Sequence, residues 1–268
     1  MNHEECRARQ IEDGVFWLGG CLAAFSEGTE VHYHVSAYLV VGSKASILVD
    51  TGDPAHAPLV AAQLEHTLDG RELDYVFPTH PEIPHAGNLP MLLARYPRAR
   101  VVGDVRDYFM HYPEFDGRFE RRGPGDSIHL GDREFRFLPA HIRDLENTLW
   151  GHDSGSGTLF VSDGFSYIHD VPQPDGEDEP VHLPGQCRLT SGEMPEPPSV
   201  EQAAYGTGRA LYWTRFVDVS PAFAAIEGLL NDLPTSFIGP AHGNVIDDVA
   251  GMLRTSLAAH RRVYEGDS

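Results

Sequence analysis

Histidine and carboxylate residues crowd together in the segment Thr79-His-Pro-Glu-Ile-Pro-His-Ala-Gly87. His80 and Glu82 are two residues apart, so an extended chain would point both side chains to the same side. His85 follows within one further turn of chain. Imidazoles and carboxylates are both common ligands of transition metals. The segment therefore predicts a metal site, and the alternative is a polar loop whose residues cap a helix.

Three more candidate ligands, His141, Asp163 and His242, each come directly after a short apolar run. A polar residue at the end of a strand is usually only solvated, but several such endings of His or Asp type favour a shared site. With the first segment they supply four histidines and two carboxylates, which is enough for two metal ions. Asp163 is the candidate bridge, because a carboxylate can give one oxygen to each ion.

The elements that must position these ligands are strands and helices in alternation. Runs rich in β-branched and aromatic residues predict strands at 15–19, 37–41, 45–50, 74–79 and 98–103. Apolar spacing predicts helices between them, at about 54–68 and 87–95. This alternation indicates helices packed on the faces of a sheet. Ligands at the carboxyl ends of such strands can converge on one crevice.

The second half of the chain begins with a different pattern. Short apolar runs between 127 and 161 alternate with Gly, Asp and Ser turns, as in antiparallel hairpins. Helical patterns follow at about 200–230 and 245–264, with a strand at 236–239 between them. The stretch 170–199 is rich in proline, glycine and acidic residues and predicts an exposed excursion. We therefore expect one domain over residues 1–268 with this excursion on its surface.

Length and charge exclude several classes of function. The 268 residues, 41% of them hydrophobic, are enough to form a sizeable core. A formal net charge of −20 repels phosphate backbones and argues against a nucleic-acid partner. No run approaches the roughly 18 apolar residues of a membrane helix, and the N-terminus lacks the apolar core of a signal peptide. The sequence predicts a cytoplasmic protein without a membrane partner.

The cysteines and the remaining histidines carry weaker signals. Cys6, Cys21 and Cys187 are odd in number and widely spaced, which predicts reduced structural or surface thiols rather than a disulfide framework or a paired thiolate site. His32 and His34 precede a predicted strand and could approach the metal pocket from a loop, although surface or core packing is the alternative.

Two residues near the candidate ligands are not expected to bind metal. Asp50, in Val-Asp-Thr-Gly, is expected to organise its loop by accepting backbone hydrogen bonds. His169, beyond Asp163, is expected to be solvated.

The order of these motifs resembles the metallo-β-lactamase superfamily, over roughly residues 14–260. The resemblance is carried by five segments, which are Asp50-Thr-Gly after a strand, Thr79-His with His85-Ala-Gly, His141, Leu159-Phe-Val-Ser-Asp163, and Gly239-Pro-Ala-His242-Gly. It implies an α/β (α+β) fold of αββα type, in which two mixed sheets are flanked by helices.

Glu82 narrows the resemblance to one branch. Hydrolytic members usually carry His-x-His-x-Asp-His and bind zinc, whereas Glu82 is similar to the second position of flavodiiron proteins and related diiron oxygen-binding proteins or oxygenases. A carboxylate in place of an imidazole makes the site harder and favours iron over zinc. By position, the resemblance implies one iron on His80, Glu82 and His141, and a second on His85 and His242, with Asp163 bridging.

Pro84 departs from the family pattern, which has an aspartate immediately before the second histidine. Proline has no ligand atom, so the second metal would keep two histidines and one shared carboxylate. That ion would bind more weakly or with an extra open position. In hydrolytic members the aspartate helps to hold the nucleophilic water, so its loss argues against hydrolysis.

The leading hypothesis is a non-haem diiron protein that binds or activates O2 or NO, as an oxidoreductase, an oxygenase or an oxygen sensor. The alternatives are a zinc hydrolase of an ester, thioester, lactone or amide, and a binding module with one metal or none. Flavodiiron proteins take electrons from a fused flavin domain, for which the sequence up to Ser268 leaves no room. A separate electron donor or a small-molecule substrate would then supply electrons, and a homodimer is permitted.

Overall fold

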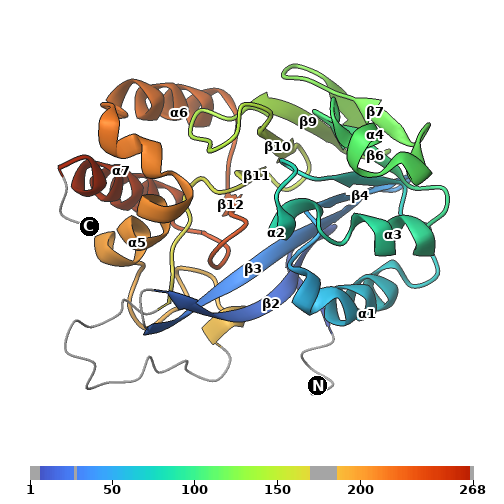
Figure 1. Cartoon of the computed structure of the whole chain (residues 1–268), viewed down its shortest axis with the longest axis horizontal. Helices are drawn as coiled ribbons and strands as arrows, with labels where there is room; N and C mark the ends of the chain where they lie inside the picture. Colours follow the sequence, from blue (N-terminus) through green and yellow to red (C-terminus); the bar gives the residue numbers. More distant parts are fainter. Residues whose placement is uncertain (1–6, 27–28, 170–185, 266–268) are drawn as a thin grey trace.

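Two β-sheets lie between two sets of helices in the computed structural model, which describes residues 7–26, 29–169 and 186–265 (Figure 1). The first sheet has seven strands in the order β1-β2-β3-β4-β5-β6-β7, and the second has five in the order β12-β11-β10-β9-β8. Helices α1 and α3 lie on one outer side, and α5, α6 and α7 lie on the other (Figure 1). The predicted αββα sandwich is confirmed.

The first sheet is antiparallel at one end and parallel at the other. Strands β1 to β4 pair antiparallel, and β4 to β7 pair parallel. Parallel neighbours need a crossover, and helices supply it after β4 and after β5. The strands are β1 (Arg9–Glu12), β2 (Val15–Ser26), β3 (Thr29–Val41), β4 (Ser46–Val49), β5 (Tyr75–Phe77), β6 (Arg100–Gly103) and β7 (Phe119–Arg121). The helices are η1 (Pro54–His56), α1 (Ala57–Leu68), α2 (Ile83–Ala86), α3 (Leu89–Arg95), α4 (Tyr108–His111) and η2 (Pro113–Phe115).

The second sheet is built from hairpins and one parallel edge strand. Strands β8 to β11 are antiparallel, and β12 joins β11 in parallel. A capping box at Ser199 and Gln202 starts α5 (Val200–Ala210), the first α-helix of this half. The strands are β8 (Ser127–His129), β9 (Glu134–Pro139), β10 (Leu149–Asp153), β11 (Thr158–Phe160) and β12 (Phe237–Gly239). The helices are η3 (Gln186–Arg188), α5 (Val200–Ala210), η4 (Tyr212–Phe216), α6 (Ser220–Asp232) and α7 (Val249–Glu265).

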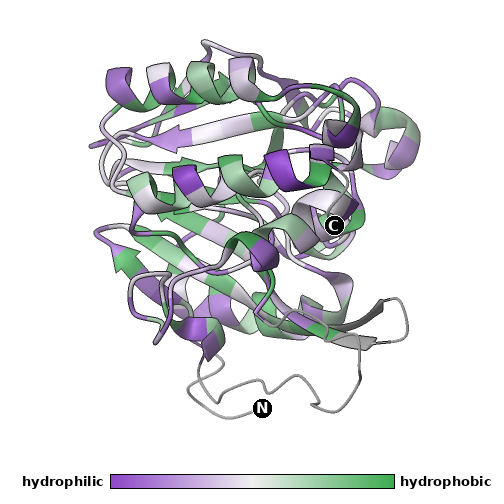
Figure 2. Ribbon diagram, turned by 90° about the vertical axis from the view of Figure 1, so that its left-hand side faces the viewer, coloured by the Kyte–Doolittle hydropathy of each residue, from purple (hydrophilic) through white to green (hydrophobic). Residues whose placement is uncertain are grey.

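Three apolar clusters fill the spaces between the layers. One, which includes Leu48 and Leu64, lies between the first sheet and α1 and α3. The second, rich in aromatic rings such as Phe77 and Phe137, lies between the sheets. The third packs the second sheet against α5, α6 and α7. Along the helices, hydrophilic and hydrophobic residues alternate, as expected when one face is buried (Figure 2).

The structure differs from the predicted elements at β3, which begins at Thr29 and not at 37. His32 and His34 therefore lie on a strand and not on a loop. The reason is local, because Val31-His-Tyr-His-Val35 has a two-residue alternation that a search for uninterrupted apolar runs does not detect. The helical pattern at 200–230 is likewise interrupted by η4.

The predicted excursion at 170–199 falls in large part on 170–185, outside the described residues. The part that is described, 186–199, is not wholly exposed. Cys187 and Ser191 are buried, and the Ser191 amide donates to the Val245 carbonyl at 2.8 Å. None of the helices in the described part of the chain combines the length and the apolar character that spanning a membrane requires.

Candidate metal centre

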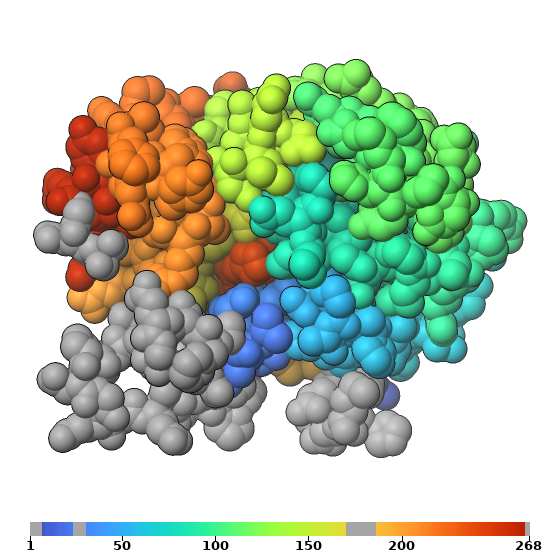
Figure 3. Space-filling view, in the orientation of Figure 1, coloured from blue at the N-terminus to red at the C-terminus, as the bar shows by residue number. Residues whose placement is uncertain are grey.

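Polar residues gather where strands of both sheets end at the same edge. Asp50 follows β4 and His80 lies just beyond β5, while Asp163 and His242 lie just beyond β11 and β12. Parallel strands bring their carboxyl ends together, which is where α/β folds place their sites. In the space-filling view, the red segment after β12 lies in a hollow at the middle of this face, between blue, teal and yellow-green segments (Figure 3).

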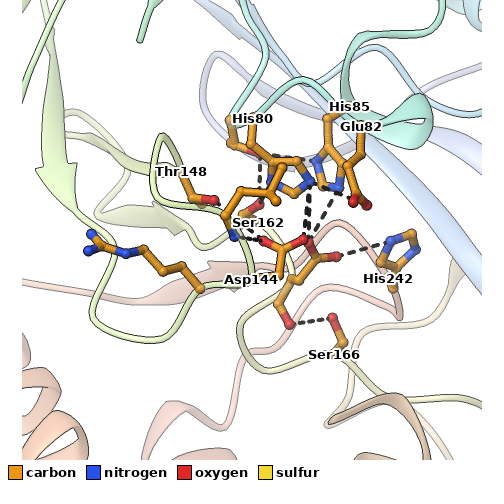
Figure 4. A network of polar contacts seen from close by, with 12 residues as sticks. His80, Glu82, His85, Asp144, Thr148, Ser162, Ser166 and His242 are labelled. Atoms are coloured by element: carbon orange, nitrogen blue, oxygen red, sulfur yellow. Dashed lines mark hydrogen bonds and ion pairs between the residues drawn. The ribbon is translucent and has the colours of Figure 1, made fainter. Parts of the chain in front are cut away.

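Asp163 is the centre of the group. His80 Nε2 lies 3.5 Å from Asp163 Oδ2, and His85 Nε2 lies 3.6 Å from the same oxygen. On the other side, His242 Nε2 lies 3.1 Å from Asp163 Oδ1 (Figure 4). The ligand atoms of His80, His85 and Asp163 are within 4.8 Å of one another. A carboxylate whose two oxygens face different imidazoles is arranged as a bridge between two ions would be.

A second group of donors shares His80. Its Nε2 lies 3.8 Å from Glu82 Oε2 and 3.7 Å from Asp144 Oδ2. These three residues also converge within 4.8 Å. The Glu82 side chain is 54% exposed and that of Asp144 is 12% exposed, so the group opens toward solvent on the Glu82 side. The separations exceed hydrogen-bond length and leave space among the donors.

Asp50 fixes the orientation of His85. The Asp50 Oδ2 oxygen lies 3.0 Å from His85 Nδ1. An ionised carboxylate only accepts, so Nδ1 carries a proton, and Nε2 faces Asp163 as the atom that a metal ion would bind. A buried carboxylate behind a ligand histidine is the arrangement that holds imidazoles in metal sites.

Thr79 and Ser162 fix the orientation of His80. The Thr79 amide donates to Asp50 Oδ1 at 2.7 Å, and its hydroxyl lies 2.9 Å from Ser162 Oγ. Ser162 Oγ in turn lies 2.9 Å from His80 Nδ1, which leaves Nε2 facing the centre. Asp50 and Ser162 both have positive φ, at 57° and 54°. Non-glycine residues in this region are strained, and such strain gathers at functional sites.

Electrostatics at the centre are dominated by carboxylates around buried imidazoles. Burial alone would raise the pKa of Asp163, but His85 and His242 hold it well below its usual range. Burial would lower the pKa of His85, but Asp50 and Asp163 raise it well above its usual range. Burial also raises the pKa of Asp144. The carboxylates thus attract positive charge to this place.

Two buried nitrogens indicate that a bound cation supplies the positive charge which the carboxylates attract. His80 Nε2 and His85 Nε2 have no hydrogen-bond partner among the described residues. A buried polar atom left unpaired costs about 1–3 kcal/mol, yet both atoms face the same oxygen of Asp163. Imidazole and carboxylate donors suit transition metals. The residues present therefore fit a metal site.

His141, a predicted ligand, is not in the converging groups of described residues. Its ring packs edge-on against Trp150 with centroids 5.9 Å apart. It lines a hollow of about 590 Å³ beside Asp144 and Trp213. Asp144 is not among the predicted ligands, because it lies within the loop between β9 and β10 and not at a strand end. The only signal was an acid three residues after His141.

His32 and His34 also lie outside the converging groups around Asp163. His34 Nδ1 is 3.0 Å from Ser36 Oγ, and its ring lies 4.5 Å from that of Trp17. His32 Nδ1 is 3.3 Å from the sulfur of Cys21.

The chain matches a known protein family. The pattern that defines the metallo-beta-lactamase superfamily matches residues 32–175, more than half of the chain. The chain belongs to the metallo-beta-lactamase superfamily. The predicted flavodiiron-like resemblance within the superfamily agrees with the named relatives.

The chain is 30% identical over 180 residues to a coenzyme F420H2 oxidase of Methanothermobacter thermautotrophicus, which covers 63% of this chain and 44% of the oxidase. It is 27% identical over 166 residues to a nitric oxide reductase of Moorella thermoacetica, covering 58% and 41%. The flavodiiron protein of Giardia intestinalis has a similar fold, with a TM-score of 0.70 and 16% identity over 97% of this chain and 60% of that one. The chain spans less than half the length of these two curated relatives.

Proposed function

We propose that this superfamily member is a non-haem diiron oxidoreductase that binds and reduces O2 or NO. The observation that carries the proposal is the placement of Asp163, whose two oxygens face histidines on opposite sides. Glu82 and Asp144 add carboxylates, which are harder donors than imidazole and favour iron. The relatives named as an oxidase and a nitric oxide reductase support the same chemistry.

The proposed ligand set combines the converging groups with the division between two irons that the resemblance implies. We assign one iron to the side of His80, Glu82 and Asp144, and the other to the side of His85 and His242, with Asp163 between them. Asp144 takes the place that the resemblance gave to His141, which stays a candidate at the margin of the same hollow. Pro84 lies in the first turn of α2 and adds no ligand atom.

A diiron centre bound here would supply electrons to O2 or NO, and the chain's own residues prepare the site for it. Asp50 holds the proton on the far nitrogen of His85. Ser162 engages the far nitrogen of His80. Both imidazoles are therefore held with their Nε2 atoms facing the centre, where a metal ion would bind.

A pocket of about 270 Å³ adjoins the centre at His242. The Tyr33 ring lies edge-on to the His242 ring at 5.5 Å. Most of the wall is apolar or aromatic, and includes Val31, Tyr167, Ile168 and Tyr205. Such a wall excludes water and accommodates a gas molecule or the apolar part of a small substrate. A separate electron donor completes the proposal.

The hydrolase alternative is not favoured. Hydrolysis at a metal site needs a positioned nucleophilic water, and Pro84 stands where hydrolytic relatives hold that water with an aspartate. The two named relatives are also both redox proteins.

The test is consumption of O2 and NO by the iron-loaded protein with a chemical reductant. We expect consumption of at least one gas to depend on the protein and to be lost in His85→Ala. The matched control is His66→Ala, a histidine on α1 away from the centre. Zinc-loaded protein that turns over esters or thioesters, with iron-loaded protein inert to both gases, would overturn the proposal.

A further inference from the structure

Two cysteines and one histidine converge in a second place, and a second histidine lies beside one of the cysteines. The donor atoms of Cys21, His169 and Cys187 lie within 4.8 Å of one another. Cys187 Sγ is 3.5 Å from His169 Nδ1. Cys21 Sγ is 3.3 Å from His32 Nδ1. The sequence predicted scattered thiols and a solvated His169, but the fold brings two thiols together and buries that histidine.

The tautomer of His169 is fixed by Asn244. The Asn244 amide nitrogen donates to the carbonyls of Gln186 and Leu189 at 2.8 and 2.9 Å. Its Oδ1 therefore remains as the acceptor, 2.7 Å from His169 Nε2. Nε2 must carry the proton, so Nδ1 presents a lone pair toward Cys187. Ligand histidines in metal sites almost always donate their other N–H in this way.

The backbone holds these donors in place from several sides. The His169 amide donates to the His32 carbonyl at 2.9 Å, which ties the segment after β11 to β3. Cys21 lies on β2, opposite His34 in the β2–β3 pairing. Cys187 lies in η3 and is buried. The four donors thus come from four segments that pack or pair with one another.

We propose that Cys21, His169 and Cys187 bind a zinc ion, with His32 as the fourth donor. Two thiolates and two imidazoles form a closed ligand set that suits tetrahedral Zn²⁺. Zinc bonds of about 2.0–2.3 Å place neighbouring donors roughly 3.3–3.8 Å apart. The sulfur–nitrogen separations of 3.3 and 3.5 Å lie in that range. Thiolates also select zinc over the harder ions that carboxylates prefer.

The zinc would act as a structural tie beside the first metal centre. It would join η3 to the β2–β3 hairpin through Cys187 and Cys21. His169 directly follows Ile168, which lines the pocket at His242. A zinc ion at this place would hold that pocket wall in position without touching substrate.

The first experiment is metal analysis of the full chain, loaded with Zn²⁺ and dialysed. We expect Cys21→Ser, Cys187→Ser and the double variant to lose about one zinc per chain relative to the wild type. His85→Ala, altered only at the Asp163 centre, should keep that zinc. Loss of zinc in His85→Ala but not in the cysteine variants would assign the zinc to the other centre and overturn the proposal.

The second experiment uses the unaltered chain, so that it stands even if a cysteine variant does not fold. Loading with Co²⁺ should produce sulfur-to-cobalt charge-transfer absorption, and Zn²⁺ should slow the reaction of at least two thiols with a thiol reagent. Neither result depends on iron or on gas consumption, so it can fail or succeed apart from the proposed function. A Cys21–Cys187 disulfide in protein prepared under reducing conditions, or no thiol protection by Zn²⁺, would overturn the proposal.

Discussion

The two groups of donors differ in the residue that contacts the far ring nitrogen of a histidine, the one that points away from the proposed metal. At the Asp163 centre, the far nitrogen of His85 meets the Asp50 carboxylate at 3.0 Å. At the cysteine group, the far nitrogen of His169 meets the Asn244 amide oxygen at 2.7 Å. Both partners accept a hydrogen bond from the far nitrogen, but only the carboxylate adds negative charge and makes the imidazole a stronger donor. The first arrangement suits a redox metal whose charge changes, and the second suits a fixed structural ion.

The donors themselves show the same contrast. Carboxylates surround the histidines in the first group, and sulfur atoms accompany them in the second. Hard oxygen donors and soft sulfur donors prefer different ions. A single chain could therefore separate iron from zinc by donor type alone, and variants at each group of donors test that separation.

The largest effect is expected from Asp163→Asn. Asp163 faces histidines of both iron positions, so losing one ionised oxygen should remove most of both irons. The zinc of the cysteine group should stay, and metal analysis of one preparation reads both. Asp153→Asn is the matched control, because Asp153 is also a buried carboxylate, but it contacts Arg133 at 3.4 Å and no metal donor. Equal loss of iron in the two variants would mean general unfolding and not lost ligation.

A smaller effect is expected from Asp50→Asn. The amide oxygen can still accept from His85 Nδ1, but the NH2 group then replaces the oxygen that accepts from the Thr79 amide. The substitution also removes the charge that strengthens His85 as a donor. Losing such a partner costs about 10–100-fold in metal affinity, which competition with an iron chelator would measure. Asn244→Asp makes the reverse change and should leave iron affinity unaltered. If Asp50→Asn binds iron as tightly as the wild type, the negative charge of Asp50 does not contribute to iron affinity. The difference between Asp50 and Asn244 would then not explain which metal each group binds.

Asp144 and His141 compete for the same assignment. Asp144 converges with His80 and Glu82, whereas His141 packs on Trp150. We therefore expect Asp144→Ala to lose about one iron per chain and His141→Ala to lose much less. Metal analysis separates the two variants. Greater loss in His141→Ala would restore the ligand set that the resemblance implied.

His260 is a histidine of a third kind, because its Nδ1 has neither a carboxylate nor an amide partner among the described residues. His260 on α7 is buried beside Phe223, and its Nδ1 has no hydrogen-bond partner among the described residues. Burial lowers the pKa of His260 to about 4, against about 6.5 in an unfolded chain. The unfolded state then binds more protons between these values, so the stabilisation is complete above the unfolded pKa and is lost as the pH falls toward 4.

The predicted cost is about 2 kcal/mol at a pH of about 5, relative to neutral pH. Urea unfolding of metal-free wild type and His260→Phe at both pH values measures it. The variant should lose less stability on acidification than the wild type. The same loss in both proteins would show that His260 does not titrate as its burial requires.

How much the sequence could predict depended on where each residue lies. His80, Asp163 and His242 stand directly after apolar strands, so a linear pattern marked them and topology brought them together. Asp144 lies inside a loop, where an acid is normally just solvated. No local pattern could place it.

The cysteine group was invisible for a different reason. Cys21 and Cys187 are far apart in the sequence, and neither has a second metal-binding residue at the usual spacing. Their meeting depends on the β2–β3 pairing and on the burial of Cys187 in η3. Such contacts are set by tertiary packing and not by local sequence.

The most direct test of the diiron proposal is the iron content of the chain together with its electron paramagnetic resonance after reduction by one electron. Two irons bridged by Asp163 should be spin-coupled, so the account predicts about two irons per chain and a mixed-valence signal that Asp163→Asn abolishes. One iron per chain with only an isolated high-spin ferric signal, or zinc in place of iron at His80 and His85, would contradict it.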